Sequence, residues 1–186
     1  MGKSAARGRD VAKDVANDQA ATVGVAGEIT GETTAIETGG LQWHAPAAWQ
    51  SQKPANNMRA AQLLVAPDSG AGEAMIVFSS AGIGGDIKSN IERWKGQVQD
   101  GAGQQPEAEV RARKVAGFNV TMVSIDGTLV GGTMGGPAVD RPNSSFRAAI
   151  IEGPSGNIFI KFTGPASVVS ENSAAWEQMI NGMRKP

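Results

Sequence analysis

The sequence contains no cysteine and only one histidine among its 186 residues. Without cysteine the chain can form neither disulfide bonds nor cysteine-based zinc sites. Any catalytic or metal site that needs an imidazole must use His44, and no potential ligand stands beside this residue in the sequence. We therefore expect no metal, no cofactor and no catalytic residue built on histidine chemistry.

The sequence also has no marked excess of positive or negative residues. The 17 Lys and Arg residues against 18 Asp and Glu residues leave a formal net charge of -1, so charge alone attracts the chain neither to nucleic acid nor to an anionic membrane. Arg59, Arg93, Arg111 and Arg113 could form a basic patch. Exposed aromatic residues that would stack on bases are not interleaved with them, so we expect no nucleic-acid partner.

Long apolar runs are missing as well. No stretch approaches the ~20 apolar residues that a membrane span requires, and the basic start MGKSAARGRD is not followed by the apolar segment of a secretory signal. We therefore expect no membrane span. The expected location is the periplasm or cell envelope if an export signal has been removed, and the cytoplasm otherwise.

Motifs that carry catalysis or phosphate binding do not occur. The glycine-rich stretch 82–86, GIGGD, lacks the Lys-Ser/Thr pair of a P-loop, and Ile87 stands where a dinucleotide-binding motif has its third glycine. The motif G-x-S-x-G, which would place a nucleophilic serine, is absent too. The glycine-rich stretch therefore predicts a structural turn.

Residues 1–40 contain no aromatic residue and are rich in Ala, Gly, Thr, Asp and Glu. Such a segment buries too little apolar surface to offset the entropy lost on ordering. We expect a disordered N-terminal tail or tether over residues 1–40 and a single folded domain over residues 41–186.

The clearest structural signal lies at residues 73–99. The short apolar run Ala74–Phe78 predicts a strand buried on both faces. Asp86 is a good N-cap, because its carboxylate can accept hydrogen bonds from the first turn of a helix. Ile87, Ile91, Trp94 and Val98 then recur at helical spacing and predict one apolar face.

The rest of the chain predicts strands and one further helix. Strands are expected near Leu41, over 57–66, 110–115 and 118–125, and in a hairpin of 146–151 with 157–162. Asp126-Gly127 predicts a second, tight hairpin. A closing helix carries Trp176 on an apolar stripe. We predict an α+β domain, a three-layer sandwich in which a mainly antiparallel sheet is flanked by the helices of Trp94 and Trp176.

Several of these patterns resemble an uncharacterised bacterial group whose architecture is similar to the PsbP-like fold. The residues that carry the resemblance are Trp43, Pro46, Trp49, Arg59 to Gln62, Gly84 to Asp86, Arg93, Trp94, Gln97 and the segment 149–165. The resemblance spans residues 41–183. It implies an antiparallel sheet between helices and a role as a binding module, since PsbP-like domains act mostly in that way.

We therefore expect a non-enzymatic binding or accessory domain with a protein partner. The bacterial cell envelope is one expected location for this domain. The expected contact surface joins the glycine turn, the tryptophans of the first strand and the Gly/Pro loop 131–145; its residues are Trp43, Trp49, Gly84, Gly85, Asp86, Met134, Asp140 and Arg141. One alternative is a small-ligand or lipid carrier, which needs a cavity between sheet and helix. The other is a hydrolase-type enzyme that pairs His44 with a carboxylate such as Asp86 or Asp140.

Overall fold

The computed structural model describes residues 31–67, 72–131 and 140–186. Its elements, in chain order, are β1 (Thr33–Thr38), β2 (Leu41–Pro46), β3 (Gln50–Gln52), β4 (Arg59–Val65), β5 (Ala74–Ser79), α1 (Ile87–Lys95), β6 (Val98–Gln99), β7 (Glu109–Val115), β8 (Phe118–Leu129), β9 (Arg141–Gly153), β10 (Gly156–Pro165), α2 (Ala166–Glu171) and α3 (Ser173–Asn181). No helix in these ranges is long and apolar enough to cross a membrane.

Antiparallel pairing holds the main sheet together. Its strands follow the order β3-β4-β5-β10-β9-β8-β6, and β7 pairs with β8 beside β6. The hairpin of β9 and β10 supplies the middle of the sheet, with Asn157 opposite Glu152 and Thr163 opposite Phe146. The first two strands form a separate two-stranded sheet.

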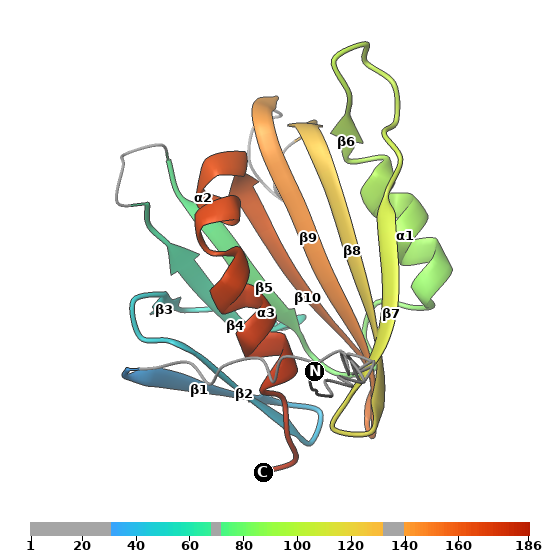
Figure 1. Cartoon of the computed structure of the whole chain (residues 1–186). Helices are drawn as coiled ribbons and strands as arrows, with labels where there is room; N and C mark the ends of the chain where they lie inside the picture. Colours follow the sequence, from blue (N-terminus) through green and yellow to red (C-terminus); the bar gives the residue numbers. More distant parts are fainter. Residues whose placement is uncertain (1–30, 68–71, 132–139) are drawn as a thin grey trace, which may run out of the picture.

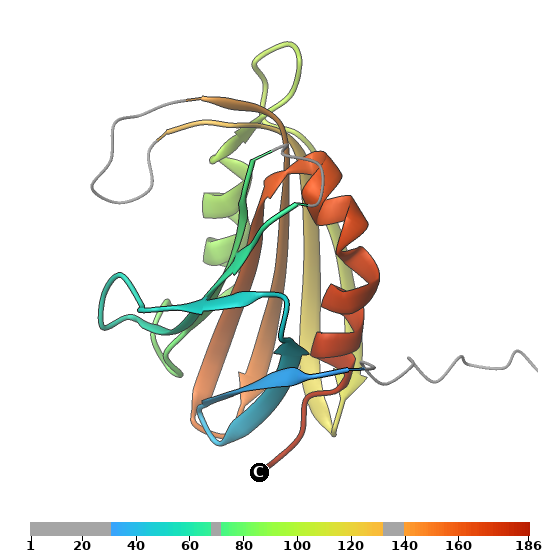
Figure 2. The same ribbon diagram turned by 90° about the vertical axis from the view of Figure 1, so that its left-hand side faces the viewer.

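Helices cover both faces of the main sheet, as Figures 1 and 2 show. On one face α2 and α3, together with β1 and β2, bury a core that includes Trp43, Phe162 and Trp176. On the other face α1 packs Trp94 against Phe146, with ring centroids 5.4 Å apart. The predicted α+β, three-layer architecture is confirmed, and both helical tryptophans are buried against the sheet.

The closing helix is divided in two at Asn172. The backbone of this residue leaves the helical conformation, its side-chain amide donates to the carbonyl of Val168 at 2.9 Å, and its Oδ1 accepts from the indole N–H of Trp49 at 3.0 Å. The break therefore links α2–α3 to the segment that follows β2.

The predicted hairpin at Asp126-Gly127 is wrong. Strand β8 continues through both residues to Leu129 and shifts register at Gly127. A Cβ at Gly127 would lie 2.3 Å from the carbonyl oxygen of Gln99, so this glycine permits the close approach of β6. Sequence reasoning mistook a glycine required by a neighbouring strand for a turn.

Two further expectations need correction. Strand β1, with Ile36 in the core, lies inside the segment expected to be a tail, and its pairing with β2 places it in the folded unit; residues 1–30 lie outside the described ranges. Strand β5 is buried on one face only: Ala74, Ile76 and Phe78 are buried, whereas the intervening residues are half-buried. The half-buried face borders the groove described next.

Candidate functional site

A groove of about 500 Å³ lies on the α1 face of the sheet, where the helix leaves strands β4, β5 and β10 partly uncovered. It lies within the size range of small-molecule sites, about 300–1,000 Å³. Its lining residues are Asn56, Met58, Arg59, Met75, Val77, Ser79, Ile83, Gly84, Asn90, Arg93, Trp94, Gln97, Leu129, Val130, Gly131, Arg141, Phe146, Phe159, Lys161 and Thr163. We call this the α1 groove.

The turn before α1 forms one end of the groove. Gly84 has a φ of 120°, and a Cβ on it would lie 2.8 Å from the ring of Phe159. Only glycine therefore allows the turn to pack this closely on the sheet. Asp86 caps the helix by accepting a hydrogen bond from the backbone N–H of Ser89 at 2.9 Å, which confirms the predicted turn and cap. The same hydrogen bonds with Ser89 lower the pKa of Asp86 below 3.8.

A buried amide orients Arg93 at the wall of the groove. Asn90 of α1 is only 2% exposed. Its Nδ2 donates to the carbonyl oxygens of Gly84 at 2.5 Å and Asp86 at 2.8 Å. Its Oδ1 accepts from the guanidinium of Arg93. The amide therefore ties Arg93 to the glycine turn without neutralising its charge.

A second buried amide orients Arg59 from the opposite side. Gln62 is 6% exposed, and its Oε1 accepts from the guanidinium of Arg59 at 2.6 Å. Buried amides must find partners because an unsatisfied one loses its hydrogen bonds to water. Here both amides use a neutral oxygen to hold an arginine, so neither arginine gains a counterion.

Lys161 lies between these two arginines in the middle of β10. It stands opposite Val77 of β5, which in turn stands opposite Gln62 of β4, so the three side chains share one face of the sheet. Burial lowers the pKa of Lys161 below its usual 10.5, and the positive charges of Arg59 and Arg93 lower it further. Both causes disfavour the charged ammonium.

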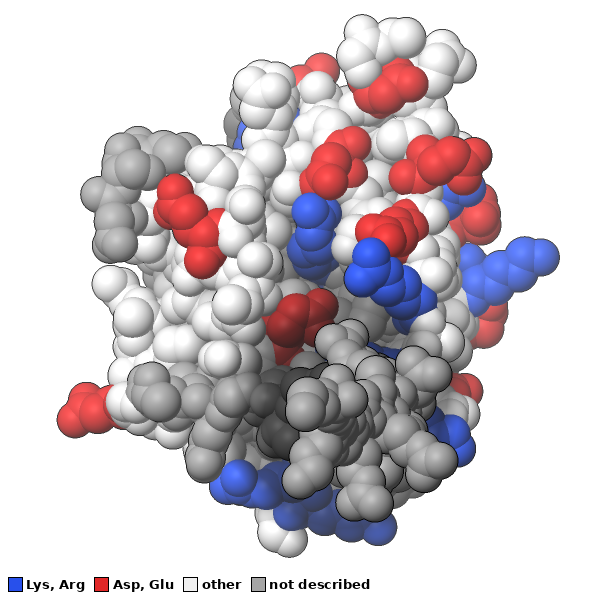
Figure 3. Space-filling model, viewed as in Figure 1, with Lys and Arg blue, Asp and Glu red and all other residues white. Residues whose placement is uncertain are grey.

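No carboxylate compensates this cluster among the residues that line the α1 groove. The described ion pairs lie elsewhere and join Lys95 to Glu92, Arg111 to Glu109, Arg113 to Glu177 and Arg147 to Asp126. On the face that carries α2 and α3, acidic and basic side chains are interspersed (Figure 3). The groove therefore concentrates positive charge in a chain whose formal net charge is -1.

Apolar side chains adjoin the cations. Of the large hydrophobic residues described as exposed, Met58 at 45% and Ile83 at 40% line the groove, whereas Val110 at 48% lies on β7. Met75 and Val77 of β5 contribute the half-buried part of the same lining. The α1 groove can therefore contact an anionic group and an apolar group at the same time.

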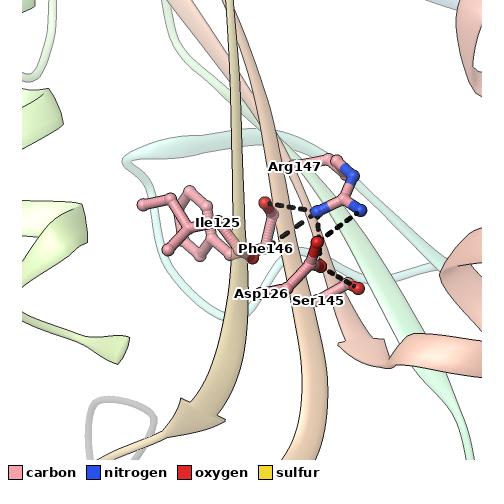
Figure 4. A network of polar contacts seen from close by, with 5 residues as sticks. All are labelled: Ile125, Asp126, Ser145, Phe146 and Arg147. Carbon is pink, nitrogen blue, oxygen red and sulfur yellow. Dashed lines mark hydrogen bonds and ion pairs between the residues drawn. The ribbon is translucent and has the colours of Figure 1, made fainter. Parts of the chain in front are cut away.

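In another charged cluster, between β8 and β9, the positive and negative side chains pair with each other (Figure 4). The carboxylate of Asp126 accepts from the guanidinium of Arg147 at 2.8 and 3.3 Å and from the hydroxyl of Ser145. Burial alone would raise the pKa of Asp126, but the hydrogen bonds from Arg147 and Ser145 outweigh it and lower the pKa below 3.8. We assign this network to pairing the two strands.

The structure separates the residues expected to form the contact surface. Trp43 is fully buried and Trp49 is 3% exposed, so neither indole can contact a partner in this conformation. Trp43 packs on Phe78 of β5 and Trp49 on Phe162 of β10, within the larger core. Gly84 lines the α1 groove. Gly85 and Asp86 are exposed in the adjoining turn. Met134 lies outside the described residues.

Asp140 and Arg141 lie at a second groove, of about 610 Å³, beside the start of α2. Glu73 lines this groove too, so charges of both signs occur in it. Arg141 also lines the far end of the α1 groove. The second groove therefore lacks the uncompensated charge of the α1 groove.

The catalytic pairing considered for His44 is not formed. The imidazole lies within hydrogen-bonding distance of Thr33 Oγ1 at 3.2 Å and of the Arg184 guanidinium at 2.6 Å. His44 lines neither groove, and its described hydrogen bonds include none to Asp86 or Asp140. The hydrolase-type alternative loses the pair of residues on which it depended.

Sequence reasoning missed Gln62, Asn90 and Lys161 as parts of a site. Arg59 and Arg93 were expected in a basic patch with Arg111 and Arg113, whose guanidiniums pair instead with Glu109 and Glu177. The available signal was Lys161, a lysine in the middle of the strand-forming run IFIKF. A cation at the centre of a sheet needs either a partner or a function.

No protein-family model matches the sequence, and no curated protein matches it. Several solved structures are similar to this chain. The cyanobacterial PsbP protein CyanoP of Synechocystis sp. PCC 6803 aligns with a TM-score of 0.51 and 11% identity, over 83% of this chain and 92% of its own. A Pseudomonas aeruginosa protein of unknown function aligns with a TM-score of 0.46 and 16% identity, over 81% and 95%. A Bacteroides thetaiotaomicron structure aligns with a TM-score of 0.44 and 12% identity, over 84% and 48%.

At 11% identity the CyanoP structure bears on the fold alone. The alignment with CyanoP spans most of both chains, and the antiparallel sheet with helices on both faces is the α+β architecture of this chain. The chain has a PsbP-like fold.

Proposed function

We propose that this protein is a non-enzymatic binding domain that recognises a negatively charged group in the α1 groove. The observation that carries the proposal is the pair of buried amides, Gln62 and Asn90, that hold Arg59 and Arg93 beside Lys161 without neutralising them. Charges oriented before binding lose little entropy when a ligand arrives, and such preorganisation favours affinity.

The energetic cost of this arrangement supports a role in binding. A half-buried ammonium beside two guanidiniums destabilises the folded chain, because desolvation and like charges both act against it. An anion that enters the groove offsets that cost and gains charge-assisted hydrogen bonds. Proteins commonly retain destabilising groups of this kind where function requires them.

Of the binding roles considered from the sequence, the structure favours a ligand that enters the groove over a partner held by the tryptophans. The carrier alternative required a cavity between sheet and helix; the α1 groove lies beside α1 instead, over strands that the helix leaves uncovered, and offers a ligand open access to them. Recognition of a negatively charged ligand fits a protein of the cell envelope and a protein of the cytoplasm equally well.

Thermal unfolding in inorganic phosphate tests the proposal. A ligand that binds only the folded state raises the melting temperature, and each kcal/mol raises it by about 2–4 °C in a chain of this size. Sodium chloride keeps the ionic strength constant across the titration. We expect phosphate to raise the melting temperature of the native chain more than that of the double variant Arg93→Met/Lys161→Met.

The matched control is the double variant Arg111→Met/Lys114→Met, which removes the same charge from exposed positions on β7. It is needed because phosphate also stabilises proteins in general by exclusion from their surface. The control should respond like the native chain. Equal phosphate responses in both double variants would exclude the α1 groove as an anion site.

A further inference from the structure

We propose that the ligand of the α1 groove is a single-chain amphiphile, with an anionic head group among Arg59, Arg93 and Lys161 and an aliphatic chain against the adjoining apolar residues. This inference rests on the proposed function and specifies the class of its ligand. The positions of the cations, the apolar residues beside them and the pairing of the strand backbones point to this class of ligand.

The cations converge on one place. Arg59 comes from β4, Arg93 from α1 and Lys161 from β10, and both arginines influence the charge of the lysine. Three cations that line one groove of about 500 Å³ match a compact anionic head group, such as a carboxylate or a phosphate monoester. A long polyanion would instead need basic residues spread along a surface, together with stacking aromatic side chains.

Apolar surface lies directly beside this position. Val77 stands opposite Lys161 in the sheet, and Met75 follows on the same face of β5. Met58 and Ile83 add exposed apolar surface at the rim. Methionine side chains adapt readily to irregular apolar ligands. Each methylene that leaves water in such a groove contributes roughly a fourfold gain in affinity.

A peptide strand is a poorer fit, because the floor of the groove offers no free sheet edge. Strands β5 and β10, which contribute most of the floor, each have a hydrogen-bonded neighbour on both sides, and β3 pairs with β4 from Gln62 to Leu64, so these backbone groups cannot pair with an added strand. The occupant must therefore be recognised by side chains. An aliphatic chain with one charged end uses the available contacts and needs no backbone partner.

Calorimetric titration of the full chain with three probes tests this inference: dodecyl phosphate below its critical micelle concentration, butyl phosphate and the neutral dodecyl maltoside. We expect dodecyl phosphate to bind at least tenfold more tightly than each of the others, because only it combines the charge with the long chain. Its binding should also raise the melting temperature, as specific binding to the folded state requires.

Variants of the groove test the binding of the head group and of the aliphatic chain separately. Lys161→Met should weaken dodecyl phosphate at least tenfold and leave dodecyl maltoside unchanged. The double variant Met58→Ser/Ile83→Ser, at exposed positions, should weaken dodecyl phosphate several-fold and leave butyl phosphate unchanged. Val110→Ser and Arg111→Met remove an exposed apolar residue and a cation outside the groove, and both should bind like the native chain.

The results that would overturn the inference differ from those that would overturn the proposed function. Equal affinity for butyl and dodecyl phosphate, both dependent on Lys161, would leave an anion site without a chain site. Tighter binding of hexaglutamate than of dodecyl phosphate would identify an acidic protein segment as the occupant. Amphiphile binding that is unaffected by every groove variant, or that lowers the melting temperature, would be nonspecific adsorption.

Discussion

Lys161 is the residue on which the charge balance of the α1 groove depends. Its neighbours across the sheet are Val77 and Ala148, neither of which can share a proton or a charge with it. Its ammonium gains no counterion among the described residues. In the absence of a ligand, the folded chain therefore carries a cation that the unfolded chain would hydrate more favourably.

We expect Lys161→Met to raise the free energy of unfolding at pH 7, by about 0.5–2 kcal/mol, the range typical of single stabilising changes. Urea denaturation measures the difference. Because the pKa of Lys161 is lower in the folded state than the usual 10.5, the unfolded state binds more protons between these two values, and native stability rises with pH there. The advantage of the variant should therefore shrink as the pH approaches 10.5.

Lys114→Met provides the comparison, since Lys114 is exposed on β7. Its substitution should change stability by no more than about 0.5 kcal/mol. If Lys161→Met destabilises the chain at pH 7 as well, the ammonium has a favourable partner in the folded state, and the groove is not the uncompensated site inferred here.

At the scale of elements, the seating of α1 forms the groove. The helix has nine residues and a diameter of about 10 Å, which covers roughly two strands spaced about 4.8 Å apart. Its buried Trp94 contacts Phe146 of β9 and Phe159 of β10, so the helix lies over that part of the sheet. The strands β5 and β4 beyond it stay uncovered on this face.

Two neighbouring glycines allow a test of how α1 is seated. Gly84→Ala should lower the free energy of unfolding by about 1–3 kcal/mol, because it adds both a strained backbone and a contact of 2.8 Å with the Phe159 ring. Gly85→Ala adds strain at a φ of 83° but meets nothing within 4 Å, so it should cost less. Chemical denaturation of the two variants separates the cost of the contact with the Phe159 ring from the cost of backbone strain.

Phosphate binding in the α1 groove is a second quantity to measure for the same two variants. Displacement of the turn by Gly84→Ala should weaken phosphate binding, because Gly84 anchors the Asn90 amide that orients Arg93. Gly85→Ala should retain it. Equal stability and equal binding in the two variants would show that the contact with Phe159 does not position the helix.

At the scale of the whole molecule, the main sheet separates two cores of unequal size. The larger core takes in β1, β2, α2 and α3, and the smaller one lies beneath α1. Ligand binding on the α1 side therefore need not disturb the larger core. The molecule can keep one rigid face and one open face on the same sheet.

Truncation measures where the folded unit begins. We expect removal of residues 1–30 to change the free energy of unfolding by no more than about 0.5 kcal/mol, as the composition of that segment predicts. Removal of residues 1–40 also deletes β1 and the buried Ile36, and should cost at least about 2 kcal/mol. Equal stability of both truncated chains would place the start of the folded unit after β1.

The sequence by itself determined the fold class, because hydrophobic periodicity and capping are local. The apolar run at Ala74, the cap at Asp86 and the helical spacing of Ile91 and Trp94 each act within a few residues. Turn chemistry was less reliable: Asp126-Gly127 resembles a hairpin, but a strand distant in sequence decided the conformation of Gly127.

Only the tertiary structure decided the site. Gln62, Asn90 and Lys161 come from three elements, and only Lys161, within the apolar run IFIKF, stands out among its neighbours in sequence. Their shared face follows from the order β4-β5-β10 and from the place where α1 docks. Charge compensation is set by distances through space. No local pattern could show that Arg59, Arg93 and Lys161 have no ion pair among the described residues, while Arg111 and Arg113 do.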